Sequence, residues 1–199
     1  MNTLPKPFFA RELLLKQELS IFTPLEFSRL FDTNSNQTKY FLEEETKRGF
    51  LLRLKKGLYA LKTDAPSEEK IANRLYQPSY ISFEYALYFH NIIPESPYQV
   101  TNATTKPTRT FTVTNRVFTY QKIKTAAYTG YKLVRNNKEC FLIAEPEKAL
   151  ADYLYFVVLG KKPYNERFNL SKINKIKLKN YAKLYKRAAL IEFAKKILP

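Results

Sequence analysis

Few residues in this chain are able to carry out nucleophilic, acid–base or metal chemistry. Its 199 residues include one histidine, His90, and one cysteine, Cys140. A zinc site normally takes three or four His, Cys or carboxylate ligands, so these two residues would need carboxylate help. The four glycines form neither a G-x-G-x-x-G nor a G-x-S-x-G sequence. We therefore expect no metal and no cofactor. We interpret His90 as a helix C-cap or a hydrogen-bonded histidine at the edge of the core, and Cys140 as a small core residue.

Two acidic groupings resemble catalytic patterns. Asp32 with Glu45-Thr46-Lys47 imitates the D…E-x-K pattern of nucleases, but these residues are expected on a helix, whereas that chemistry uses a strand hairpin. Glu145, Glu147 and Asp152 suggest a metal-binding cluster. However, the first two fall at the start of a predicted helix, where acidic groups are favoured by the helix dipole. We predict that the protein is not an enzyme.

The charge balance favours a polyanionic partner. The chain carries 34 Lys and Arg against 18 Asp and Glu, a net charge of +16, and residues 161–199 alone carry 12 basic and 2 acidic residues. The single cysteine excludes an intrachain disulfide. The first residues lack an apolar run of signal-peptide length, and the longest apolar stretch, Tyr153–Leu159, is too short to span a bilayer. We expect a cytoplasmic protein without a membrane partner.

The elements expected in the first third of the chain are those of a winged helix-turn-helix. Thr23-Pro24 with Glu26 three residues after the threonine forms a capping box, and Gly49 is suited to a helix end. The predicted helices cover 8–19, 24–31 and about 35–48. Strands at 50–54 and 58–61 then flank the turn Lys55-Lys56-Gly57. We assign the winged helix-turn-helix to residues 1–64.

A second, mixed domain is expected over residues 65–199, because the polar stretch 63–69 contains Pro66. Its predicted helices cover 67–76, 83–91 and 147–159. Strands are expected between 111 and 123 and in a hairpin over 132–144 that turns at Asn136-Asn137. Apolar residues at 181, 184, 188, 191, 194 and 198 follow the spacing of one helical stripe. The expected fold class is α+β, with a basic helical C-terminus.

The start of the third predicted helix has the residue types that read DNA. Short amides pair with adenine, and lysines reach guanine or phosphate. The candidate residues on this helix are Ser35, Asn36, Gln37, Thr38, Lys39 and Tyr40. The wing adds Arg53, Lys55 and Lys56 as candidate phosphate contacts. Glu43-Glu44-Glu45 would repel phosphate, so we expect these acids at the far end of the helix. The alternative is a winged helix used only for protein contacts.

Four stretches, at 49–59, 78–90, 104–109 and 143–152, give the chain a resemblance to the AbiEi family. These proteins are the antitoxins of type IV toxin–antitoxin and abortive-infection systems. The resemblance covers roughly residues 20–155. It implies a winged helix that represses its own promoter at inverted repeats, and a C-terminal antitoxin domain. That domain would oppose a nucleotidyltransferase-like toxin without a stable complex. Asn91 stands where the family often has glycine, although asparagine also tolerates a left-handed backbone.

The lysine-rich tail matches no family motif. Its candidate phosphate contacts are Lys172, Lys175, Lys177 and Lys179. Two alternatives remain open for this face: contact with a toxin or its RNA substrate, or a solvated helix surface that only keeps the protein soluble. For the whole protein, the alternative function is a stand-alone transcriptional regulator whose second domain binds a ligand, a protein or RNA.

Overall fold

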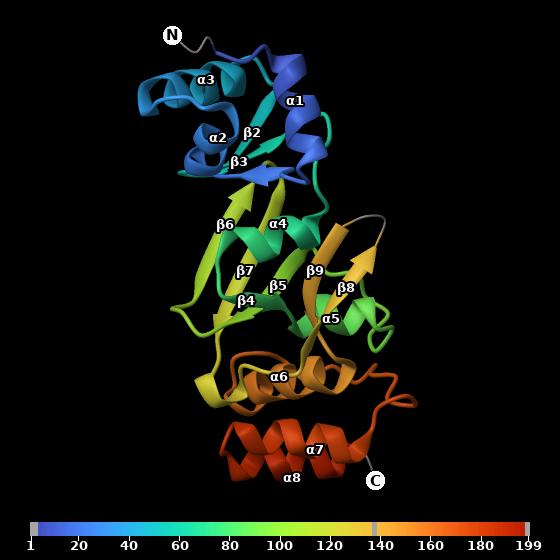
Figure 1. Ribbon diagram of the computed structural model, residues 1–199. Helices are drawn as coiled ribbons and strands as arrows, with labels where there is room; N and C mark the ends of the chain where they lie inside the picture. Colours follow the sequence, from blue (N-terminus) through green and yellow to red (C-terminus); the bar gives the residue numbers. More distant parts are fainter. Residues whose placement is uncertain (1–3, 137–138, 198–199) are drawn as a thin grey trace. The chain divides into compact units, whose positions relative to one another are not determined.

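The computed structural model describes residues 4–136 and 139–197. In this part of the chain it has eight α-helices, one short 3-10 helix and two β-sheets, so the expected α+β class is confirmed (Figure 1). The chain folds as two compact units, the first ending at Leu75 and the second beginning at Tyr76. Each unit has its own sheet and its own buried side chains.

The first unit packs helices against a small antiparallel sheet with strand order β1-β3-β2. In chain order its elements are α1 (Pro7–Lys16), β1 (Ile21–Phe22), α2 (Pro24–Phe31), α3 (Ser35–Lys47), β2 (Leu51–Lys55), β3 (Leu58–Leu61) and α4 (Glu68–Leu75). Helix α1 ends before the predicted Leu19, because Glu18 takes a left-handed backbone with φ of 55°. Strand β1 was not predicted, since two residues are too few to show a period of two.

Reciprocal caps fix the starts of α2 and α3. The Thr23 hydroxyl accepts a hydrogen bond from the Glu26 N–H at 3.2 Å, and the Glu26 carboxylate accepts one from the Thr23 N–H at 2.6 Å. This is the predicted capping box. Asn34 caps α3 in the same way, with Gln37 as its reciprocal partner. Each cap satisfies backbone donors that the first helical turn leaves without an intrahelical partner.

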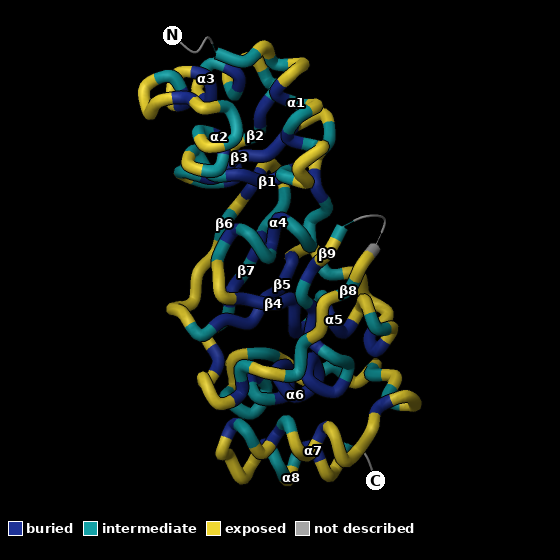
Figure 2. The backbone as a smooth tube through the Cα atoms, in the orientation of Figure 1, coloured by how far each residue is buried: buried dark blue, intermediate teal, exposed yellow. Residues whose placement is uncertain are grey.

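Aromatic packing holds α2 against α3. The Phe27 ring is fully buried and lies 4.9 Å from the Phe41 ring and 5.8 Å from the Phe22 ring. Leu42 and Leu14 complete this core from α3 and α1. Full burial of a side chain of this size contributes about 1.5–3 kcal/mol. Helix α3 buries Thr38 and Glu45 as well as Phe41 and Leu42, and its other residues are half-buried or exposed (Figure 2).

Helix α4 belongs to the first unit, although the sequence placed the change of domain between 64 and 65. Arg74 on α4 donates hydrogen bonds to both carboxylate oxygens of Glu26, at 2.9 and 3.0 Å. The Lys55 ammonium donates to the Leu75 carbonyl oxygen at 2.6 Å. These contacts join residues 20 to 48 positions apart in the chain. A local polar stretch with a proline therefore does not mark the division.

The second unit is built on a six-stranded mixed sheet with strand order β6-β7-β5-β4-β9-β8. Its strands are β4 (Ser79–Ile81), β5 (Gln99–Thr104), β6 (Arg109–Val113), β7 (Arg116–Lys122), β8 (Tyr131–Asn136) and β9 (Glu139–Ala144). Its helices are α5 (Phe83–Phe89), the 3-10 turn Thr125–Ala127, α6 (Pro146–Val158), α7 (Lys175–Leu184) and α8 (Ala188–Lys196). Strand pairs β4–β9 and β5–β7 are parallel, and the other pairs are antiparallel.

Helix α6 lies between the sheet and the α7–α8 pair (Figure 1). Nine of its residues are buried, and Figure 2 shows this helix as largely dark blue. Its first turns include two charged residues with no exposed surface, Lys148 and Asp152. Their side chains form an ion pair with each other. Asp152 is therefore part of a buried polar network, which is where the sequence suggested an acidic cluster.

The tail is helical, as predicted, and its residues form two helices in place of one continuous stripe. Helix α7 ends at Leu184, and α8 begins at Ala188. Lys186 lies between them with a left-handed backbone, φ 48°. Fully buried Tyr185 turns into the unit at this break. The buried positions of the two helices, Leu178, Ala182, Leu190 and Ala194, share only Ala194 with the predicted stripe, whose member Ala188 is exposed.

Cys140 is exposed on β9, so its interpretation as a core residue was wrong. It lies opposite Arg135 of the edge strand β8, which is exposed as well. Alternating burial places Phe141 and Ile143 in the core instead. The predicted hairpin strands over 132–144 are present. Of their predicted turn, Asn137 lies outside the described residues.

Candidate nucleic-acid interface

Helix α3 presents a polar face to solvent. Ser35, Asn36, Lys39 and Tyr40 are all exposed, and Tyr40 keeps 59% of its surface accessible. These positions are spaced by one, three and four residues, so they fall on adjoining strips of the same helix surface. The opposite side of α3 is held by the buried Phe41 and its neighbours. Four of the six candidate residues on this helix are therefore free to meet a ligand.

The structure gives Gln37 and Thr38 other roles. Thr38 is 2% exposed, and its hydroxyl lies 2.8 Å from the hydroxyl of buried Thr33. It cannot reach a base edge, so its prediction as a DNA contact was wrong. The Gln37 side-chain oxygen accepts the Asn34 backbone N–H at 3.1 Å and thereby completes the α3 cap. The capping role of Gln37 is recognisable in the sequence, because a glutamine three residues after Asn34 at a predicted helix start matches the spacing of a capping box.

Arg53 and Lys56 extend the positive surface along the hairpin. Both are exposed, Arg53 on β2 and Lys56 in the turn before β3. Lys55 is half-buried, and its ammonium is hydrogen-bonded to the Leu75 carbonyl at the end of α4. Lys55 therefore stabilises the first unit instead of extending the charged surface. The sequence could not show this, since the partner lies 20 residues away.

A groove of about 340 Å³ runs between α2 and α3. Ser35 and Lys39 contribute from α3, and Leu25, which is 58% exposed, contributes from α2. The complete lining is Pro24, Leu25, Ser28, Ser35, Thr38, Lys39, Leu42 and Tyr59. Leu25, Ser28 and Tyr59 were not predicted as site residues. In the sequence, Leu25 is simply an apolar residue near the start of a short helix. Such a residue more commonly belongs to the core than to a binding surface.

A second groove, of about 270 Å³, flanks the later turns of α3. It is lined by Glu43, Thr46, Lys47, Arg53 and Tyr59. Because Tyr59 lines both grooves, they follow the same side of α3, from its first turn towards its end. This arrangement brings Lys39, Lys47 and Arg53 to one surface of the unit.

The three consecutive acids of α3 have different surroundings. Glu45 is 5% exposed and forms a salt bridge with Arg48 at 2.9 Å. Glu44 accepts a hydrogen bond from Lys47 at 2.8 Å, which lowers the pKa of Glu44 below its ordinary value. Glu43 is exposed and lines the same groove as Arg53. The expectation that all three acids lie away from the basic surface therefore fails for Glu43.

The residues of the nuclease-like pattern are not assembled as a site. Asp32 forms the left-handed C-cap of α2, while Glu45 is a buried residue of α3. Among the described residues, no three His, Cys, Asp or Glu side chains lie in a group able to hold a metal ion. No helix in the described ranges is long and apolar enough to cross a bilayer.

The four tail lysines are exposed in the second unit. Lys175 and Lys179 lie one turn apart on α7, and Lys177 approaches Glu145 at 3.6 Å. Lys172 lines a separate pocket of about 250 Å³ together with His90. Only part of this lysine group therefore shares one helical surface.

His90 is the C-cap of α5. Its Nε2 lies 2.8 Å from the Ala144 carbonyl oxygen, so this nitrogen donates the hydrogen bond. Burial lowers the pKa of His90, and the bond to Ala144 opposes that shift. Asn91 follows with φ 57°, the left-handed conformation for which its side chain is suited. The predicted C-cap role is confirmed.

No protein-family model matches this chain, and neither does any curated protein sequence.

Proposed function

We propose that the first unit is a winged helix-turn-helix that binds duplex DNA, with α3 in the major groove. The single observation that carries this proposal is the exposed polar face of α3, which is bordered by cationic side chains. The order α1-β1-α2-α3-β2-β3 supports it, because a winged helix places a hairpin directly after its second and third helices. The hairpin β2–β3 would be the wing, and its two-residue turn makes it a short one.

Each exposed side chain has a role in this proposal. Asn36 is suited to pair with adenine through its amide, while Lys39 reaches guanine or a phosphate. The hydroxyl groups of Ser35 and Tyr40, which flank Asn36 and Lys39 in the sequence, donate hydrogen bonds to phosphate oxygens of the DNA backbone. Arg53 and Lys56 contact phosphates beside the groove, so they contribute affinity with little sequence preference. The start of α2 supplies backbone N–H groups for a further phosphate.

We further propose that the protein is an AbiEi-type antitoxin acting in the cytoplasm. It would repress the promoter of its own operon, and its second unit would oppose a nucleotidyltransferase-like toxin. The support is the resemblance over residues 20–155, together with the basic surface of the first unit. A nucleotidyltransferase-like gene directly downstream is the outcome expected. An unrelated neighbour would favour a stand-alone transcriptional regulator.

Removing one base-reading side chain is expected to weaken binding to DNA from upstream of the protein's own gene. Asn36→Ala and Lys39→Ala should each cost about 1–3 kcal/mol, because each removes a groove contact and leaves the fold intact. Fluorescence anisotropy at fixed salt measures the change. Lys16→Ala, which removes an exposed lysine of α1 outside both grooves, is the matched control. Equal affinities for all four proteins would refute the placement of α3.

The tail lysines are expected to bind phosphates, which the salt dependence of DNA binding detects. The combined change of Lys172, Lys175, Lys177 and Lys179 to glutamine should reduce the log–log salt slope by about 0.9 for every phosphate that a lysine neutralises in the wild type. The control replaces the exposed Lys132 and Arg135 of β8 by glutamine. An unchanged slope for the tail variant would mean that these lysines do not touch the DNA.

A further inference from the structure

Glu43 occupies the centre of the α3 face that the proposed function turns towards DNA. Positions 36, 40, 43 and 47 follow one another at intervals of three or four residues, so they form one strip of the helix. Glu43 is exposed on this strip and shares a groove with Arg53 and Tyr59. A carboxylate is thus present on a surface otherwise suited to a polyanion.

Its two acidic neighbours are neutralised, whereas Glu43 is not. Glu44 and Glu45 each form a salt bridge three residues along the helix, with Lys47 and Arg48. Within the described residues, Glu43 interacts with Lys47 only at longer range. A carboxylate repels the DNA phosphates, which makes the free energy of binding less favourable. This repulsion becomes stronger as water is displaced from between the charges. Glu43 therefore weakens binding unless a hydrogen-bond donor of the DNA meets it.

We infer that Glu43 determines sequence specificity by selecting cytosine in the DNA-binding site. This inference rests on the proposed function. In the major groove cytosine offers only its N4 amino donor, which a carboxylate accepts well. Guanine offers two acceptors, and thymine an acceptor and a methyl group, so both leave the carboxylate without a donor. Adenine has one donor, but its adjacent N7 acceptor repels the second carboxylate oxygen.

A neighbouring cation completes the recognition of a C·G pair. Lys39 is exposed one turn before Glu43 on α3, whereas Lys47, one turn after it, forms a salt bridge with Glu44. A lysine beside a carboxylate can bind O6 and N7 of the guanine that pairs with the selected cytosine. A carboxylate and an ammonium on successive turns of α3 therefore match the hydrogen-bond donor of cytosine and the hydrogen-bond acceptors of guanine.

The experiment selects random-sequence duplexes with the full-length protein and sequences the bound fraction. Wild type is expected to enrich cytosine at one position by about tenfold over the other bases. Glu43→Gln should change that preference to adenine, because a glutamine amide pairs with N6 and N7 of adenine. It should also bind non-specific DNA more tightly, since a negative charge is removed. Glu44→Gln is the matched control and should retain the wild-type sequence preference.

The outcomes separate this inference from the proposed function. If wild type enriches no sequence and binds no duplex, the proposed function itself is wrong. If wild type enriches a site and Glu43→Gln enriches the same site with the same base preferences, the specificity role is refuted while DNA binding stands. Uniformly tighter binding by Glu43→Gln without a change at any one position also refutes it, because Glu43 then only repels phosphate.

Discussion

Asp152→Asn is expected to destabilise the second unit by about 3–5 kcal/mol, the cost of removing one partner from a buried ion pair. Asp152 and Lys148 have no exposed surface. One carboxylate oxygen accepts from the Lys148 ammonium and from the Tyr185 hydroxyl at 2.5 Å. The other accepts from the Tyr80 hydroxyl at 2.9 Å and the Ser82 hydroxyl at 2.7 Å. An asparagine has one acceptor oxygen and no charge, so it cannot replace both sets of contacts.

The unpaired lysine accounts for most of the expected loss. Burial lowers the pKa of Lys148, and the hydrogen bond and charge of Asp152 oppose that shift. Without the carboxylate, the ammonium must either remain charged in an apolar interior or lose its proton. The double variant Lys148→Met/Asp152→Asn removes this charge. It is therefore expected to be more stable than Asp152→Asn alone, even though it carries more substitutions.

Tyrosine signals make this measurement specific to the second unit. Thirteen of the 15 tyrosines lie in residues 76–199, and the chain has no tryptophan. Urea unfolding followed by near-ultraviolet circular dichroism therefore reports mainly on this unit. Glu192→Gln is the control, since its salt bridge with Lys195 is exposed and screened by water, so its loss should leave the stability close to that of the wild type. A destabilisation below about 1 kcal/mol for Asp152→Asn would contradict the role assigned to the network.

The same network connects the tail to the rest of the second unit. Tyr185 lies at the break between α7 and α8, and its ring stacks on Tyr155 of α6 at 4.1 Å. Its backbone carbonyl accepts a hydrogen bond from Lys124 at 2.6 Å. Loss of Asp152 should therefore loosen the two tail helices first. Hydrogen exchange would detect this as faster exchange in 175–196 than in the sheet.

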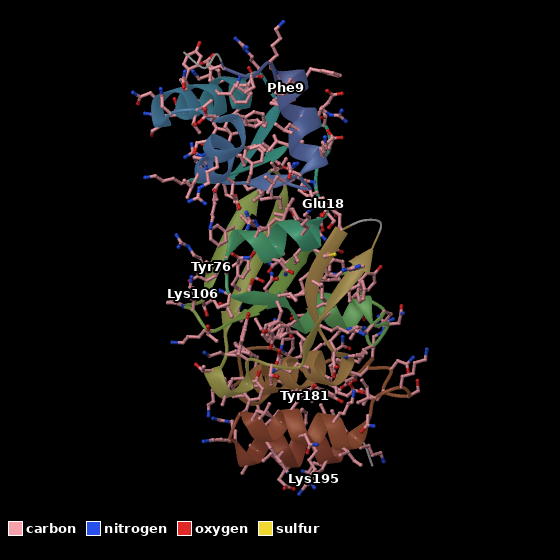
Figure 3. The ribbon with its side chains drawn as sticks, viewed as in Figure 1. Phe9, Glu18, Tyr76, Lys106, Tyr181 and Lys195 are labelled. Carbon is pink, nitrogen blue, oxygen red and sulfur yellow. The ribbon has the colours of Figure 1, made fainter. Side chains whose placement is uncertain are left out.

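Gly130→Ala is expected to destabilise the second unit by about 2–5 kcal/mol. Gly130 has φ 74°, and a left-handed backbone costs a residue with a Cβ about 1–2 kcal/mol. An added Cβ would also lie only 2.5 Å from Cε1 of Tyr181, whose hydroxyl is bound to Glu145 at 2.9 Å. Figure 3 shows Tyr181 between α6 and α7. Overpacking of this kind typically costs about 1–3 kcal/mol more.

Gly160→Ala separates the two contributions. Gly160 has φ 68°, but an added Cβ there would meet no atom within 4 Å. Its alanine variant therefore carries the backbone cost alone and should lose about 1–2 kcal/mol in the same urea experiment. Tyr181→Leu in the Gly130→Ala background should recover part of the difference. If the two glycine variants unfold at the same urea concentration, close contact between Tyr181 and Gly130 is not important for stability.

Local interactions account for what could be read from the sequence. The starts of α2 and α3, the C-cap at His90 and the α3 polar face all depend on residues within four positions of one another. A cap or a turn satisfies backbone groups of its own segment, so its residues are recognisable without knowledge of the rest of the chain. Ser35, Asn36, Lys39, Tyr40 and the wing cations Arg53 and Lys56 were proposed as candidates for the same reason, and all of them are exposed.

Tertiary contacts decided the rest, because burial depends on partners that are distant in the chain. The Thr38 hydroxyl and the Lys55 ammonium are of suitable types for DNA contact, but one is buried and the other binds α4. The tail breaks at Tyr185 since that side chain bonds to Asp152, 33 residues earlier. Residue type and spacing thus determined which side chains are candidates for the proposed DNA contact. Only the packing of helices and sheets decided which of them reach solvent, and that Glu43 lies among them.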